Sequence, residues 1–339
     1  MHTSELRTLY ERPGPWASVY VDASGVEPGA RQRLDLRWRG LRERLERDGA
    51  NAATCGALED QLLDEGITTG LGARAVFAAD GVVGFTRDLP QPPSQDIASF
   101  TELPHVAPLV RAIGEPVRWV RADVDRTGGT VTTTAGATTH VSGESTYPIS
   151  KVSAGGWSMP RYQRAAETNW DRNSADVAGA VVKAVDRSRA DVVVVSGDVR
   201  ARQLLVSRLP GVVASRVVEI DHESPGHYGG DPVLDEATSR AITNVAVARR
   251  DQTLDRFRAG LSDRHAVRGL GPVTESVRDQ QVETLLLAPQ ENAREIWSDA
   301  DNPAIVANVK SYLGMYRPVE TSADDALLGA AAMSGANVM

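Results

Sequence analysis

The chain has 339 residues, of which 41% are hydrophobic and 24% are charged, and its formal net charge is −8. This length exceeds what one ordinary hydrophobic core organises, so we expect two or three domains with the composition of a globular protein. The acidic charge argues against a protein that coats DNA, because non-specific DNA binding depends on many phosphate contacts.

The distribution of charge, apolar residues and cysteine narrows the class further. Residues 141–221 hold 11 Lys and Arg against 9 Asp and Glu, whereas the segments on either side are acidic. A positive middle between two acidic ends suggests local contact with nucleic acid. No apolar run approaches the roughly 20 residues that span a bilayer, and the first residues lack the features of a signal peptide. The single cysteine, Cys55, fits a reducing cytoplasm and is expected to be buried.

Residues 1–115 are predicted to form an N-terminal α/β domain. The expected elements are a strand at 16–22, helices at 30–49 and 52–66, and a hairpin with strands at 74–79 and 82–85. Asp80-Gly81 favours the tight primed turn that this hairpin requires. The helix at 30–49 carries an apolar stripe with helical spacing, formed by Leu34, Trp38, Leu41 and Leu45.

Residues 116–245 are predicted to form a middle domain with a mixed sheet and a long helix. The expected elements are strands at 117–124, 130–134 and 138–141, a long helix at 160–188, a strand at 191–197, a helix at 198–208 and a strand at 212–220. The strand at 191–197 is almost continuously apolar, which is typical of a strand buried on both faces of a parallel sheet. The last three elements have a βαβ pattern.

Residues 246–339 are predicted to form a C-terminal α/β/α sandwich, entered through a helix at about 232–261. The expected elements are a helix at 272–281, a strand at 283–288, a helix near 302–313, a strand at 315–320 and a helix at 322–334. The last residues, 334–339, are expected to stop inside a strand of this domain, which leaves open a longer natural chain.

The most informative segment is a glycine-containing loop, residues 150–158, and the start of the long helix that follows it. Gly155 and Gly156 permit positive φ angles and a close backbone approach to another surface. Unpaired RNA bases stack on aromatic rings and on arginine, and this segment combines both with an absence of acidic residues. The alternative is a flexible turn whose Trp157 packs on its own domain. The candidate RNA-binding residues here are Lys151, Gly155, Gly156, Trp157, Ser158, Arg161, Tyr162 and Arg164.

This order of elements resembles the middle domain of the archaeal and eukaryotic class I peptide chain release factors. The resemblance rests on the strand hairpin, the Gly-Gly loop, a helix carrying Arg-Tyr-Gln-Arg at 161–164, and a Val-rich strand ending in Ser196-Gly197. The segment from Gly271 to Val277, with the strand sequence at 282–287, looks like the third domain of the same family. The resemblance covers most of residues 116–339 and is weaker over the first domain.

Two departures from the release factors change what the resemblance implies. Members that release nascent peptide place glutamine after the two glycines, where this chain has Trp157, and the Asn-Ile-Lys-Ser motif that reads stop codons does not occur in residues 1–115. The chain therefore looks like the bacterial branch of the family, including ribosome hibernation factors, which enter a vacant A site. The resemblance implies binding to the 70S ribosome through 16S and 23S rRNA, with elongation factor Tu as the protein that the third domain can meet.

The helix at 30–49 is the most basic segment of the first domain, and Arg33 and Arg37 are its candidate rRNA contacts. Two interpretations stay open for this helix. Asp35, Glu43 and Glu46 can pair with arginines four residues away and leave an ordinary solvated face. Alternatively, several arginines form a stripe that faces rRNA phosphates, which would make binding strongly dependent on salt.

The remaining candidates favour no catalytic residue, no metal and no cofactor. His222 and His227 flank a Pro-Gly turn, so they cannot share a helix face as the ligands of a zinc protease do. Ser196 ends a strand where α/β enzymes often bind ligands, but no histidine lies near it in sequence.

These observations predict a cytoplasmic, non-catalytic translation factor of three domains that occupies the A site of idle ribosomes, with no DNA or membrane partner. Two alternatives remain. A ribosome rescue factor would hydrolyse peptidyl-tRNA, if the altered loop still positioned a water against the ester. An α/β metabolic enzyme with no link to ribosomes is kept open by the acidic net charge.

Overall fold

The computed structural model describes residues 3–25, 28–63, 72–114, 117–125, 127–142, 159–222, 231–288, 294–309 and 314–339, with the side chains of 3–4 and 159–170 left out. The chain divides into two compact units. Unit 1 consists of residues 1–115 and 256–339, and unit 2 consists of residues 116–255. The second boundary falls inside one continuous helix, α8 (Pro232–Asp263). Among the described residues, no helix is long and apolar enough to cross a membrane.

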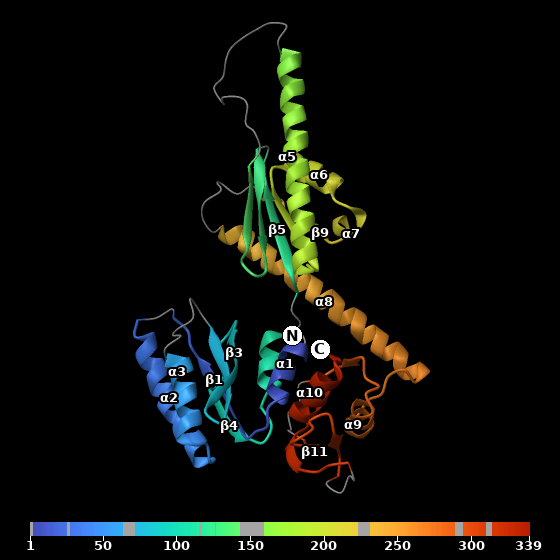
Figure 1. The fold of residues 1–339 in the computed structure, drawn as a ribbon. Helices are drawn as coiled ribbons and strands as arrows, with labels where there is room; N and C mark the ends of the chain where they lie inside the picture. The colour runs from blue at the N-terminus through green and yellow to red at the C-terminus, as the bar shows by residue number, and fades with distance from the viewer. Residues whose placement is uncertain are drawn as a thin grey trace. The chain divides into compact units, whose positions relative to one another are not determined.

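The first part of unit 1 is built around a four-stranded antiparallel sheet in the order β3-β2-β1-β4 (Figure 1). The strands are β1 (Trp16–Asp22), β2 (Ala73–Ala79), β3 (Val82–Leu89) and β4 (Ile97–Thr101). Alternate residues of β1 face opposite sides, as strand geometry requires. Ala17, Val19 and Val21 pack on one side, and Trp16 and Tyr20 pack on the other.

Two helices cover the first side of this sheet, α2 (Ala30–Arg47) and α3 (Ala52–Leu63). The predicted apolar stripe of α2 is confirmed, because Leu34, Trp38, Leu41 and Leu45 are its buried residues. Cys55 of α3 is buried and free, as predicted. The hairpin at 74–85 is also confirmed, with Asp80 and Gly81 both at positive φ in its turn.

The other side of the sheet is covered by helices from both ends of the chain. These are α1 (Thr3–Tyr10), α4 (Ala107–Ile113) and α10 (Ala323–Ser334). One core joins Leu6 and Leu9 of α1 with Leu109 of α4 and Leu328 of α10. The two terminal segments therefore share a hydrophobic interior. Sequence patterns did not predict α1, α4 or β4.

A buried carboxylate fastens the C-terminal segment to the N-terminal one. Asp325 is 3% exposed, and its Oδ1 accepts a hydrogen bond of 2.8 Å from the Ala107 backbone N–H. Its Oδ2 lies 2.6 Å from Nδ1 of His105, and the His105 backbone carbonyl accepts from the Tyr20 hydroxyl at 2.5 Å. Beside it, Asp324 forms an ion pair with Arg111. Three polar groups from α4 and the connection before it are thus satisfied by residues more than 200 positions away.

The rest of the C-terminal segment holds two small sheets. The parallel pair is β10 (Thr284–Leu285) with β14 (Asn337–Val338), and the antiparallel sheet β12-β11-β13 consists of Val306–Ala307, Glu295–Asp299 and Pro318–Ser322. They pack with α9 (Leu270–Arg278) and α10. The helix predicted near 302–313 is wrong over residues 302–309. Asp299 there accepts the backbone N–H groups of Asp301 and Asn302 in a turn, and β12 follows.

Unit 2 is a five-stranded sheet in the order β7-β6-β5-β8-β9 with helices on its faces (Figure 1). Its strands are β5 (Trp119–Val124), β6 (Gly128–Thr133), β7 (Thr138–Ser142), β8 (Val192–Gly197) and β9 (Val217–Glu219). The meander β5-β6-β7 is antiparallel, whereas β8 runs parallel to both β5 and β9. Every residue of β8 is buried, which confirms the prediction from its apolar run.

Helices α5 (Met159–Ser188) and α6 (Val199–Arg208) pack on one face of this sheet, and α8 packs on the other. The βαβ pattern is confirmed, but the strand expected over 212–220 is shorter. A one-turn helix, α7 (Gly211–Ala214), takes the first residues after Pro210, and only β9 remains as a strand. Gly197 closes the β8 end at φ +106°, where an added Cβ would lie 1.9 Å from the Val124 carbonyl oxygen.

Replacing Asp325 by Ala is expected to lower the free energy of unfolding of the protein by about 2–4 kcal/mol. The substitution leaves the buried Ala107 N–H group and the His105 ring without their hydrogen-bond partner. Asp301→Ala is the matched control, since Asp301 forms an exposed ion pair with Arg317 and its loss should cost less than about 1 kcal/mol. Denaturant titration of both variants measures the difference. Equal effects would show that Asp325 does not fasten the two segments.

Candidate nucleic-acid interface

The residues predicted to touch RNA divide into two groups in the structure. Five of the eight residues from the glycine loop and its helix lie outside the described residues: Lys151, Gly155, Gly156, Trp157 and Ser158. The other three, Arg161, Tyr162 and Arg164, lie on the backbone of α5, which is described, although their side chains are not. Their geometry toward a ligand therefore stays a prediction.

The two halves of α5 differ in how they relate to the sheet of unit 2. The second half of α5 packs in the core of unit 2 through Val177, Ala178, Val181 and Val185. Figure 1 shows the N-terminal half extending past the ends of the strands. Arg161, Tyr162 and Arg164 belong to the first turns of this N-terminal half.

Helix α2 separates its arginines into two stripes. Arg39 pairs with Asp35 at 2.6 Å, and Arg42 bonds both Glu46 at 2.8 Å and Glu59 at 2.6 Å. These pairs confirm self-neutralisation along one stripe. A second stripe, which follows from the 3.6-residue period, consists of Arg33, Arg37, Gly40, Arg44 and Arg47.

Arg37, one of the two predicted rRNA contacts on α2, is held by two carboxylates of unit 1. Its Nη1 lies 2.8 Å from Asp96 and its Nη2 lies 3.1 Å from Asp22. The hydrogen bond to Asp96 raises the pKa of Arg37. Burial raises the pKa of Asp22, but hydrogen bonds from Ser24 and the charges of Arg37 and Arg33 outweigh burial, so this pKa lies below its ordinary value. Arg37 thus ties α2 to β1 and to the residue preceding β4.

The other arginines of the second stripe differ in how they are engaged. Arg33 donates from Nη1 to the Pro28 carbonyl at 2.9 Å. Arg44 and Arg47 are exposed, and neither has an ion pair with any residue that the structure describes. Their charges are therefore available to an external anion. Sequence analysis did not single them out, although their seven- and ten-residue spacing from Arg37 places them on one helix face.

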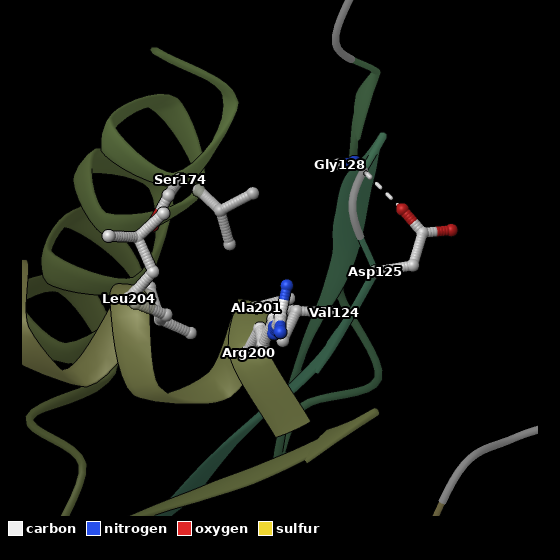
Figure 2. A pocket seen from close by; sticks show the side chains of 9 residues that line it. Val124, Asp125, Gly128, Ser174, Arg200, Ala201 and Leu204 are labelled. Atoms are coloured by element: carbon white, nitrogen blue, oxygen red, sulfur yellow. Dashed lines mark hydrogen bonds between the residues drawn. The ribbon is translucent and has the colours of Figure 1, made fainter. Parts of the chain in front are cut away.

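The carboxyl ends of the parallel strands hold a small cavity (Figure 2). Its volume is about 50 Å³, room for only a few water molecules. Ser196 donates to Asp123 at 3.1 Å and is fully buried. The N-terminus of α6 is capped by the Asp198 carboxylate, which occupies the place an anion would take. The cavity is lined by Val124, Asp125, Gly128, Ser174, Val177, Arg200, Ala201, Leu204 and Leu205.

His222, weighed above as a metal ligand, instead faces a carboxylate. Its Nε2 lies 2.6 Å from Oδ2 of Asp231. Asp231 also accepts hydrogen bonds from the backbone N–H groups of Val233 and Leu234, and it thereby caps the N-terminus of α8. Within the described ranges, no three His, Cys, Asp or Glu side chains gather in a way that could hold a metal ion.

Comparison with known proteins identifies the family. The model of Bacterial archaeo-eukaryotic release factor family 2 matches residues 118–263. Two relatives from Mycobacterium tuberculosis, uncharacterized protein MT2704 (strain CDC 1551 / Oshkosh) and uncharacterized protein Rv2629 (strain ATCC 25618 / H37Rv), are each 32% identical over 346 residues, which cover 99% of this chain and 91% of the relative. The chain belongs to the bacterial branch of the archaeo-eukaryotic release factor family.

Solved structures with detectable similarity are more distant. The archaeal translation termination factor aRF1 is 17% identical, with a TM-score of 0.27, over 98% of this chain and 88% of that one. Pelota from Archaeoglobus fulgidus is 14% identical, with a TM-score of 0.30, over 64% of this chain and 63% of that one.

The two stripes of α2 predict different effects on stability. Arg37→Ala should lower the free energy of unfolding by about 1 kcal/mol, because Asp22 and Asp96 then face each other without a cation, in a partly solvated setting. Arg44→Ala and Arg47→Ala should stay within about 0.5 kcal/mol of the wild type. Urea titration of the three variants measures this. A larger loss at Arg44 or Arg47 would mean that these residues have structural partners.

Proposed function

We propose that this protein is a non-catalytic translation factor that occupies the A site of idle ribosomes and inhibits translation in the manner of a hibernation factor. The observation that carries the proposal is Trp157, which follows Gly155-Gly156 in a chain of release-factor ancestry. Releasing members need glutamine there. A chain with the two glycines but without the glutamine keeps a backbone that can approach RNA closely and lacks the side chain required for hydrolysis.

The loop and its helix supply what an RNA cavity accepts. Glycines allow close backbone approach, the indole of Trp157 offers a stacking surface, and Lys151, Arg161 and Arg164 supply positive charge. Stacking on unpaired bases is worth about 1–3 kcal/mol per base. Because α5 extends beyond the sheet of unit 2, the loop would reach 23S rRNA while the core of the domain stays outside.

The first domain would contact 16S rRNA on the decoding side through the second stripe of α2. Arg44 and Arg47 would bind phosphates there, and Arg37 would hold the helix in place. Lys and Arg that neutralise phosphates make binding weaken as salt rises. The C-terminal segment would be the contact for elongation factor Tu, a partner that rests on the family resemblance alone.

Sedimentation with vacant 70S ribosomes tests the proposal directly. The purified full-length chain should co-sediment with 70S particles at low salt and should be displaced by A-site tRNA. In extracts of stationary or stressed cells it should migrate with 70S fractions. Failure to co-sediment at low salt would contradict ribosome binding, and binding without competition by tRNA would contradict the A-site assignment.

Substitution at Gly40 tests the α2 stripe without removing any arginine. A Cβ at Gly40 would meet nothing within 4 Å, so Gly40→Glu should fold, and its carboxylate would lie one turn from both Arg37 and Arg44. We expect affinity for 70S ribosomes to fall about tenfold, a loss of about 1.4 kcal/mol. Gly56→Glu on α3, equally free of contacts, is the matched control. Equal affinities of the two variants would contradict an rRNA-facing stripe.

Release assays separate this proposal from the rescue-factor alternative. Ester hydrolysis requires a water placed precisely against the carbonyl, a task that the Trp157 side chain cannot share. A backbone amide could in principle stabilise the oxyanion, so the measurement matters. We expect the wild type to liberate no more peptide from stalled ribosomes than Gly155→Pro does. Release above that control would make the protein an enzyme.

A further inference from the structure

A groove on unit 2 lies apart from the small cavity at the strand ends. It runs between the second half of α5 and the β6–β7 hairpin, with a volume of about 520 Å³. Both walls belong to unit 2, and α5 lies against these strands in Figure 1. The residues that line it are Val131, Thr133, Ala135, Ala137, Thr139, Ala175, Asp176, Gly179, Ala180, Lys183, Ala184, Arg187 and Ser188.

Small side chains keep this groove open. Alanines line much of it on both the helix and the hairpin side, and Gly179 interrupts the helix wall. A Cβ built at Gly179 would meet nothing within 4 Å, so no packing contact requires glycine there. Glycine in a helix interior is destabilising relative to alanine. Gly179 thus adds to the open space beside α5.

The polar groups of the groove are mostly cationic or hydroxylic. Lys183 and Arg187 are exposed, and neither side chain has a partner in the described part of the chain. They lie one helical turn apart, about 6 Å along the axis. Thr133 and Thr139 add hydroxyl groups from the hairpin, and Asp176 is the single carboxylate among the lining residues.

The hairpin wall ends at an open sheet edge. Strand β7 is the last in the order β7-β6-β5-β8-β9, and its pairing within the described residues is with β6 alone. It is largely exposed and rich in threonine. An edge strand presents unpaired backbone N–H groups, which are donors for phosphate oxygens.

We infer that this groove binds the phosphodiester backbone of a looped or single-stranded RNA segment, a second RNA contact of unit 2 besides the Gly-Gly loop. Two cations one turn apart, hydroxyl donors and an open strand edge suit consecutive phosphates, and the small residues leave room for the sugars. The inference rests on the proposed ribosome binding for its natural ligand, rRNA. The alternative ligand is an acidic protein segment, which would not need the hydroxyl groups of Thr133 and Thr139.

Arg187 could instead serve only the helix terminus, because a cation in the last turn of a helix interacts favourably with the macrodipole. That role makes a separate forecast. It attributes to Arg187 a small gain in helix stability, and to Lys183 and Arg187 no effect on RNA binding. Binding measurements with two kinds of variant distinguish the roles.

The test compares variants that discharge or fill the groove with matched controls. The double variant Lys183→Ala/Arg187→Ala removes two positive charges from the groove. Its control, Arg240→Ala/Arg250→Ala, removes two exposed arginines of α8 that already have acidic neighbours. Gly179→Glu fills the groove with a carboxylate, whereas Gly179→Ala leaves it open. Circular dichroism melting confirms that each variant folds. Each protein is titrated, at several salt concentrations, with a fluorescent unstructured RNA oligonucleotide and with vacant 70S ribosomes.

We expect Lys183→Ala/Arg187→Ala to bind the oligonucleotide more weakly than the wild type. The slope of log affinity against log salt should become shallower by about 1.5, because two phosphate contacts are lost. Gly179→Glu should weaken binding similarly, and both controls should match the wild type. Unchanged oligonucleotide binding in both groove variants, or no oligonucleotide binding by the wild type, overturns the inference. Groove-dependent RNA binding without 70S binding would instead overturn the proposed function alone.

Discussion

The packing of α5 on the five-stranded sheet is the constraint on which the rest of unit 2 depends. Val177, Val181 and Val185 fix the second half of the helix against a sheet that includes β8, a strand buried throughout. Parallel pairing of β5 with β8 needs Gly197 at the strand end, because any side chain there would collide with the Val124 carbonyl. With that half fixed, the N-terminal half of α5 extends past the ends of the strands (Figure 1).

Unit 1 solves a different problem, which is to hold together two ends of the chain. Its first sheet needs cover on both faces. The N-terminal segment supplies α2 and α3 for one face, but α1 and α4 share the other with α10 from the far end. Asp325 satisfies the polar groups at this junction. The long α8 then joins the two units as one helix.

Charge is distributed so that structural and available cations are distinct. Arg37, Arg39 and Arg42 are engaged by carboxylates, whereas Arg44, Arg47, Lys183 and Arg187 have no ion-pair partner in the described ranges. An acidic chain can therefore present local cationic surfaces. Such an arrangement favours binding at defined positions over indiscriminate attraction to nucleic acid.

Local periodicity was enough to determine much of this protein. The α2 stripe, the Asp-Gly hairpin, the buried β8 and the long α5 all follow from spacing within one element, and the residues around Gly155 carried the family resemblance. Short elements such as α1, α4, β4 and β12 gave no comparable pattern, because their existence depends on distant partners. Tertiary structure alone decided which arginines form ion pairs within the protein. Asp22 and Asp96 meet Arg37 from 15 and 59 residues away, and no sequence period encodes such a distance.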